Sequence, residues 1–139
     1  MEKQSFKTFL TEGNKLVKVA RDLGKTGEPR HFGVMSAWTG EHSPSKNKER
    51  QRGLKVLVKH LGHSYVNTEG VYKGSGEDSI MIHPKEGQSS EEFKKDLIAL
   101  GTSYGQESVL HYDGKPDNVG RIIATKPNAQ WDDKAFNVG

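Results

Sequence analysis

Apolar residues recur at steps of three and four in three stretches of the chain, and this spacing predicts helices. The first stretch covers residues 5–23, where Gly13 and Asn14 interrupt the pattern, so two short helices fit as well as one. The second covers residues 44–61. It begins at Ser43-Pro44, the order of an N-cap followed by a first-turn proline, and Gly62 can end it.

A third helix is predicted from Ser89, which forms a capping box with Glu92, to Tyr104, because Gly105 follows as a stop signal. Between the helices, short runs rich in β-branched and aromatic residues predict strands. These runs cover residues 31–39, 64–73, 77–83, 108–112 and 119–125. Glycines at positions 74 and 76 predict a hairpin turn between the second and third runs.

The predicted elements follow the order helix, then β-α-β-β-α-β-β. This order indicates an α+β fold: a mainly antiparallel sheet with two helices and a ferredoxin-like centre, plus an N-terminal helix. We expect residues 1–30 to be an N-terminal helical leader and linker, and residues 31–139 to form a single α+β domain. In the C-terminal tail, Trp131 and Phe136 are expected to anchor the chain to the body of the domain.

Composition excludes several classes of protein. The 139 residues are 32% hydrophobic, and no apolar run is long enough to predict a membrane span. Cysteine is absent, which removes disulfides, thiol nucleophiles and thiolate metal sites. A reducing cytoplasm fits this composition, and we expect no membrane partner.

The helix predicted over residues 44–61 carries the most informative arrangement of polar residues. Its apolar stripe passes backwards from Leu54 through Arg50 and Asn47, close to the helix N-terminus. Backbone N–H groups and the helix dipole favour anions there, and an arginine adds a two-pronged donor. Alternatively, the two side chains are structural, with Asn47 bonded to loop backbone and Arg50 paired with an acid such as Glu77.

The same helix is strongly basic. Six basic residues against a single acid give residues 43–60 a charge of +5, more than the +3 of the whole chain. A one-sided basic helix is typical of nucleic-acid binding, although a solvated helix face has the same composition. The residues that would contact nucleic acid in that case are Lys46, Lys48, Arg52, Lys55 and Lys59.

No motif in the chain predicts catalysis or a bound metal. The six histidines do not occur in a zinc-binding spacing, and the chain has neither a phosphate-loop motif nor a Gly-x-Ser-x-Gly motif. We therefore assign no catalytic residue, no metal and no cofactor, and lean towards a protein that is not an enzyme.

Four short motifs occur in a recognisable order. They are Ser36-Ala37-Trp38-Thr39, Asn47-x-x-Arg50-x-x-x-Leu54, Glu77-Asp78-Ser79 and Tyr104-Gly105-Gln106-Glu107-Ser108. Over residues 32–125 the chain resembles an uncharacterised family of bacterial and tailed-phage proteins, domain of unknown function 3293, and its phage relatives. The resemblance implies a set of recurring polar positions and no established activity.

Because polar groups at the ends of strands and helices build pockets in such sheets, we expect these positions to bind a ligand. The candidate ligand-binding residues are Ser36, Asn47, Arg50, Glu77, Ser79, Gln106 and Ser108.

The N-terminus carries a second resemblance. Residues 6–12, Phe-Lys-Thr-Phe-Leu-Thr-Glu, are similar to the capsid-targeting leaders of internal proteins in T4-like phages, which are cut after a Leu-x-Glu triplet. This implies cleavage after Glu12, although an amphipathic helix docked on the sheet would have the same pattern.

Together these observations predict a non-enzymatic accessory binding protein of a tailed phage. We expect it to act in the host cytoplasm, with packaging in the capsid as a further possibility, and to bind a host protein or a small anionic ligand. Two alternatives remain open: an enzyme acting on a nucleotide or nucleic acid with the same residues, and a DNA-binding accessory protein that uses the helix 44–61.

Overall fold

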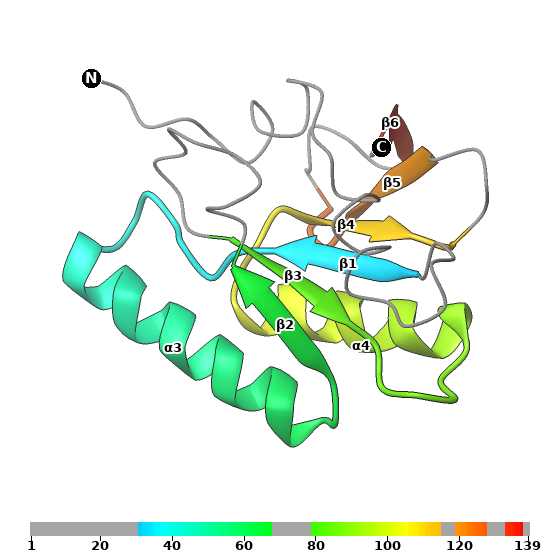
Figure 1. The fold of residues 1–139 in the computed structure, drawn as a ribbon. Helices are drawn as coiled ribbons and strands as arrows, with labels where there is room; N and C mark the ends of the chain where they lie inside the picture. Colours follow the sequence, from blue (N-terminus) through cyan, green and yellow to red (C-terminus); the bar gives the residue numbers. More distant parts are fainter. Residues whose placement is uncertain (1–30, 68–78, 115–118, 128–132, 138–139) are drawn as a thin grey trace.

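A computed structural model gives the fold (Figure 1), and it describes residues 31–67, 79–114, 119–127 and 133–137. The helix expected over residues 5–23, the capsid-targeting leader, the hairpin turn at 74–76 and Trp131 lie outside the described residues. So does the proposed division at residue 30.

The described strands form one six-stranded sheet in the order β2-β3-β1-β4-β5-β6, and each neighbouring pair is antiparallel. The strands are β1 Phe32–Met35, β2 Ser64–Asn67, β3 Ile80–His83, β4 Ser108–Tyr112, β5 Val119–Ala124 and β6 Lys134–Asn137. Two helices, α3 Pro44–His60 and α4 Ser90–Ser103, cover the same face of the sheet (Figure 1). The predicted α+β class is therefore confirmed.

The first four strands and both helices form the expected ferredoxin-like centre. Helix α3 connects β1 to β2, and helix α4 connects β3 to β4. In the sheet order β2-β3-β1-β4, one antiparallel strand separates the two strands that each helix connects. This split β-α-β arrangement is the one that the alternation of helices and hairpins in the sequence predicts.

Both helices begin where the capping residues predict. The Ser43 hydroxyl accepts a hydrogen bond from the backbone N–H of Lys46 at 3.2 Å. At the other end of α3, the left-handed Gly62, whose φ is 93°, follows the C-cap Leu61. In α4 the Ser89 hydroxyl accepts from the N–H of Glu92 at 3.2 Å and donates to its carboxylate at 3.0 Å. Within the described ranges, neither helix is long and apolar enough to cross a membrane.

Alternate residues of the central strands are buried on both faces of the sheet. On the helix face, Met35, Ile82 and Val109 pack with apolar residues of α3 and α4 in one cluster. On the opposite face, a second set of apolar side chains is at most 1% exposed. This set consists of Phe32, Val34, Met81, Leu110, Tyr112 and Ile122.

The structure differs from the sequence prediction at the end of the first strand and in the C-terminal tail. The strand expected over residues 31–39 ends at Met35, because side chains rather than a neighbouring strand bind the backbone of residues 37–39. The tail, expected to supply only anchors, adds β6, in which the backbone of Phe136 pairs with Gly120. Its four residues, Lys-Ala-Phe-Asn, are too few to show the alternation that predicts a strand.

Glycine at position 101 allows α4 to lie close to the sheet. A Cβ atom there would lie 2.6 Å from the Val109 Cγ1 atom and 3.0 Å from the Thr125 Cγ2 atom. We expect Gly101→Ala to lower the free energy of unfolding by about 1–3 kcal/mol, since both neighbours must move. Urea denaturation would measure this effect. Gly40→Ala is the matched control, because a Cβ there meets no atom within 4 Å; equal losses in the two variants would contradict the prediction.

Candidate functional site

The segment that follows β1 has its backbone bound by side chains. The Ala37 N–H donates to Gln51 Oε1 at 2.8 Å, and its carbonyl accepts from Arg50 Nε at 2.9 Å. The Thr39 N–H donates to Asn47 Oδ1 at 3.0 Å, and its carbonyl accepts from Asn47 Nδ2, also at 3.0 Å. Three residues of α3 therefore hold four of the polar backbone groups of this segment.

The backbone of Trp38, between Ala37 and Thr39, is also bound by side chains. The Trp38 N–H donates to the Ser36 hydroxyl at 3.0 Å, and the Trp38 carbonyl accepts from Gln106 Nε2 at 3.2 Å. All six polar backbone groups of residues 37–39 are thus bound by side chains. Such a segment cannot shift without breaking several hydrogen bonds, so the backbone that carries the Trp38 side chain is held in place.

Arg50 connects this segment to the end of α4. Besides the carbonyl of Ala37, its guanidinium donates to the Tyr104 carbonyl at 2.5 Å and lies over the Tyr104 ring, 5.5 Å from the ring centroid. Burial raises the pKa of the Tyr104 hydroxyl, and the nearby positive charge of Arg50 opposes this rise. The predicted inward position of Arg50 is correct, and the partners identified here are backbone carbonyls. Glu77, the acid suggested as a partner, lies outside the described residues.

Three serines form a row across the ends of the central strands. Met35 pairs with Ile80 in β3 and Val34 pairs with Leu110 in β4, so the same register places Ser36 between Ser79 and Ser108. All three are buried, with exposed fractions of 2%, 6% and 7%. By strand alternation they lie on the face opposite the helices, together with Val34 and Leu110.

We call Ser36, Trp38, Ser79, Gln106 and Ser108 the strand-end site. The structure brings six of the seven candidate residues to the same end of the sheet. Asn47, Arg50 and Gln106 surround residues 37–39, and the three serines lie beside that segment. That they bind a ligand stays a prediction.

Sequence reasoning missed Gln51 and did not include Trp38. Gln51 is only 3% exposed, and its amide nitrogen has no hydrogen-bond partner among the described residues. Its position could have been found, since residue 51 lies four after Asn47 and three before Leu54, on the same inward stripe. The environment of Trp38 depends on contacts with α3 and with Gln106, which no local pattern shows.

Apart from Arg50, the basic residues of α3 lie on its outer side. Lys46, Lys48, Arg52 and Lys59 are exposed, and Lys46 forms an ion pair with Glu49 at 3.6 Å. Lys55 and Lys59 lie over the ring of Tyr65 in β2, at 5.7 and 5.5 Å from its centroid. The predicted exposed basic face is therefore present.

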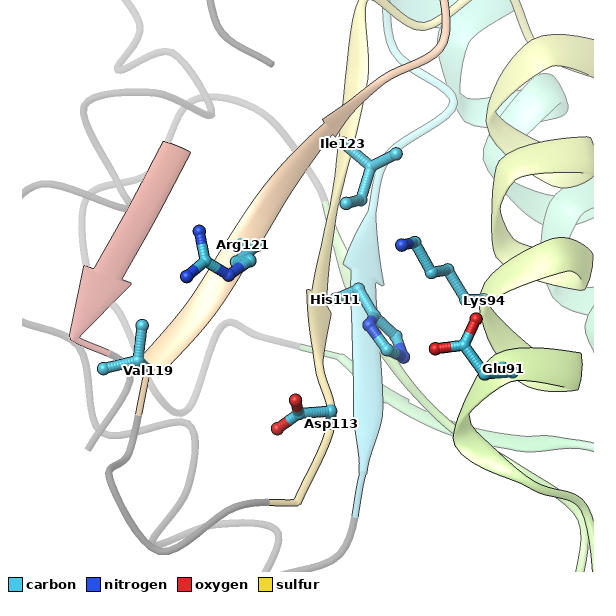
Figure 2. Close-up of a pocket in the computed structure, with 7 residues that line it drawn as sticks. All are labelled: Glu91, Lys94, His111, Asp113, Val119, Arg121 and Ile123. Atoms are coloured by element: carbon cyan, nitrogen blue, oxygen red, sulfur yellow. The ribbon is translucent and has the colours of Figure 1, made fainter. Parts of the chain in front are cut away.

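A small cavity lies beside α4, over β4 and β5 (Figure 2). It has a volume of about 130 Å³ and is lined by Glu91, Lys94, His111, Asp113, Val119, Arg121 and Ile123. Burial lowers the pKa of His111 to about 4, and the charges of Lys94 and His31 act in the same direction. Since pockets for drug-sized ligands enclose ~300–1,000 Å³, this cavity by itself has room only for a smaller molecule.

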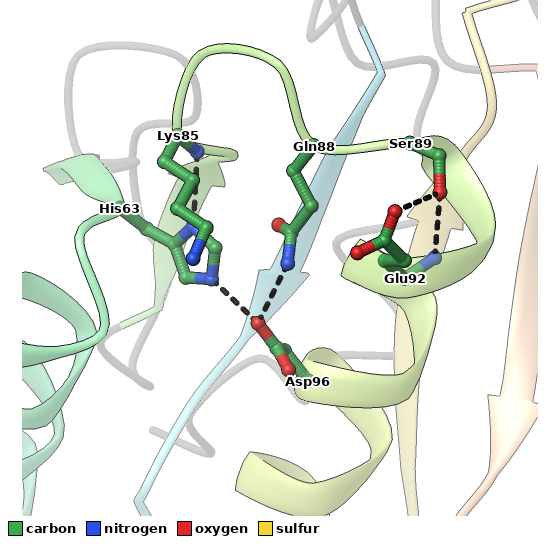
Figure 3. A network of polar contacts seen from close by, with 6 residues as sticks. All are labelled: His63, Lys85, Gln88, Ser89, Glu92 and Asp96. Atoms are coloured by element: carbon green, nitrogen blue, oxygen red, sulfur yellow. Dashed lines mark hydrogen bonds and ion pairs between the residues drawn. The ribbon is translucent and has the colours of Figure 1, made fainter.

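A second histidine belongs to a structural network (Figure 3). His63 Nδ1 accepts from the backbone N–H of Lys85 at 3.0 Å, so Nε2 carries the proton that it donates to Asp96 at 2.9 Å. Burial would raise the pKa of Asp96, but hydrogen bonds from Gln88 and His63 hold it below the usual 3.8. Both ring nitrogens are occupied, so His63 fastens the loop before α4 and is not placed to exchange a proton with a ligand.

The fold and the strand-end site define a small α+β protein with a rigid polar site at one end of its sheet. The S-adenosylmethionine lyase family matches residues 33–130, more than two thirds of the 139-residue chain. The chain belongs to this family. A sequence search of the curated proteins gave no match.

This membership corrects the function predicted from the sequence. We expected a non-enzymatic accessory binding protein, and that prediction is wrong because the family is defined by a lyase. The family implies a small-molecule substrate, which agrees with the prediction of a small ligand as partner. It gives no support for a host protein or nucleic acid as the partner. Polar residues at element ends indicate a pocket, but they do not distinguish binding from turnover.

Proposed function

We propose that this chain is a lyase that cleaves S-adenosylmethionine and that the substrate binds at the strand-end site. The observation that carries the proposal is the family match over residues 33–130, which contains every residue of that site. The predicted phage origin, and action in the host cytoplasm, are retained as part of the proposal.

The chemistry of the substrate explains what a rigid polar site contributes. A lyase breaks a carbon–sulfur bond of the sulfonium ion without adding water, and the bonding electron pair leaves with the thioether, which is neutral. The carbon that loses sulfur must complete its valence within the substrate, either by loss of a proton from the next carbon or by bonding to the substrate's own carboxylate. The thioether itself takes up no proton, so a large part of what the enzyme contributes is to hold the substrate in a reactive conformation and to exclude water. Orientation of this kind accounts for a large part of many rate enhancements. The bound backbone of residues 37–39 supplies the fixed geometry that such orientation needs.

The proposal is tested by incubating the purified chain with S-adenosylmethionine and following the substrate and the thioether by liquid chromatography and mass spectrometry. Loss of substrate should exceed that in a protein-free control. In ¹⁸O-labelled water, the carbon released from sulfur should carry no label at early times. No enhanced cleavage, or label on that carbon, would show that the chain is not a lyase for this substrate.

Two serine variants locate the reaction. Ser108→Ala removes a hydroxyl that is 7% exposed in the strand-end site, and we expect kcat/KM to fall by at least about 10-fold. Ser103→Ala, at the exposed end of α4, is the matched control and should leave kcat/KM unchanged. Equal activities of the two variants would place the reaction elsewhere in the chain.

A further inference from the structure

We propose that Trp38 and Gln106 bind the adenine base of the substrate, with the indole stacked on the purine and the Gln106 amide oxygen accepting a hydrogen bond from the purine amino group. The proposal rests on the proposed function for the identity of the substrate. It adds the residues that select the base.

Trp38 is the aromatic residue of the strand-end site. It is partly exposed, and its own backbone groups and those of both neighbours are bound by Ser36, Gln106 and three residues of α3. A backbone held in this way loses little conformational freedom when a ligand binds, which favours affinity. Aromatic side chains stack on bases through the π-face that every base has.

The orientation of the Gln106 amide follows from its neighbours. Its nitrogen faces two carbonyls, those of Trp38 at 3.2 Å and Tyr104 at 3.4 Å, and since a carbonyl only accepts, the NH₂ group must be on that side. The amide oxygen then points away from both carbonyls, and it accepts no hydrogen bond from the described residues.

The backbone of Gln106 is fixed as well. Its N–H donates to the Gly101 carbonyl at 2.9 Å, and its carbonyl accepts a hydrogen bond from the Thr125 hydroxyl. A fixed amide oxygen on a side chain that contacts the Trp38 backbone suits adenine. The exocyclic amino group of adenine is the donor to which glutamine and asparagine side chains hydrogen-bond in nucleic acids. A purine with an oxygen at that position offers no such donor, and its oxygen would face the amide oxygen.

The test uses the full chain and isothermal titration calorimetry with adenosine, which carries the base and no sulfonium. Adenosine should bind, and inosine, with an oxygen in place of the amino group, should bind at least about 10-fold more weakly. Trp38→Leu should lower the affinity for adenosine by at least about 10-fold. Trp38→Phe keeps an aromatic face and should retain most of the affinity of the unaltered chain. Gln106→Leu should remove the preference for adenosine over inosine.

Arg52→Ala, an exposed change on α3, serves as the control and should bind adenosine as the unaltered chain does. Equal affinity of the unaltered chain and of a folded Trp38→Leu variant for adenosine would overturn the role of the indole. An adenosine-to-inosine ratio unchanged in Gln106→Leu would overturn the role of the amide, and absence of adenosine binding would overturn both.

These outcomes are separate from failure of the proposed function. Cleavage of S-adenosylmethionine with an unchanged KM in Trp38→Leu would remove only the base-binding assignment. If adenosine binding depends on Trp38 but the chain does not cleave S-adenosylmethionine, only the proposed lyase activity is contradicted.

Discussion

Replacing Arg50 with alanine is expected to lower the free energy of unfolding by about 3–5 kcal/mol. The guanidinium donates to the carbonyls of Ala37 and Tyr104, which lie in two different connections of the fold. A hydrogen bond from a charged donor contributes ~1.5–3 kcal/mol, and each carbonyl that is left without its partner adds a desolvation cost. Chemical denaturation monitored by circular dichroism would measure the loss.

Arg52→Ala is the matched control, two residues further along α3. Arg52 is exposed, so its removal should change the free energy of unfolding by no more than about 0.5 kcal/mol. Arg50→Lys should fall between the two, because an ammonium group has no planar fork with which to reach both carbonyls. Comparable losses in Arg50→Ala and Arg52→Ala would contradict the role given to Arg50.

The sequence predicted the elements whose limits are set locally. Helix α3 begins at Pro44 and α4 begins after Ser89 because each start is fixed by a capping side chain a few residues away. The end of β1 was not predicted, because side chains of α3 bind the backbone where the strand would have continued. Gln51 binds Ala37, 14 residues earlier in the chain, and Asn47 binds Thr39, 8 residues earlier. Strand β6 needs β5 as a partner, and so depends on the tertiary fold.

The candidate site was predicted in part for the same reason. Asn47 and Arg50 were found because they continue an apolar stripe, and the three serines because they fall in the short motifs that carry the family resemblance. Trp38 was left out of the candidate residues: the sequence places it inside the predicted strand 31–39 and does not show its contact with Gln106. The activity could not be predicted: the candidate residues are hydroxyls, amides and one guanidinium, which bind ligands in many proteins that catalyse nothing.

The second large effect is a fall in the free energy of unfolding at acid pH, caused by His111. The pKa of His111 lies at about 4 in the folded protein against an ordinary value of 6.5, first because the imidazole is buried and then because Lys94 and His31 lie nearby. Asp113 and Glu91 act in the opposite direction and only reduce this lowering. The unfolded chain therefore takes up a proton as pH falls below about 6.5, while the folded protein does so only near 4.

Between these two values the unfolded state binds more protons, so the free energy of unfolding must fall as pH is lowered through this window. A pKa difference of this size corresponds to about 3 kcal/mol between pH 7 and pH 4. Urea denaturation at half-unit steps of pH would trace the loss. Asp96 does not mask this loss of stability, because the pKa of Asp96 is held below 3.8. The contribution of Asp96 to the free energy of unfolding is therefore lost only at lower pH.

His111→Gln should flatten this dependence between pH 4 and pH 6.5, since glutamine does not titrate there and its amide can replace the contact of His111 Nε2 with the Ser90 hydroxyl at 3.3 Å. His60→Gln, at the exposed end of α3, is the control and should retain the steep dependence. If the unaltered chain and His111→Gln lose stability in parallel, the acid sensitivity comes from another group and His111 is not held neutral by its surroundings.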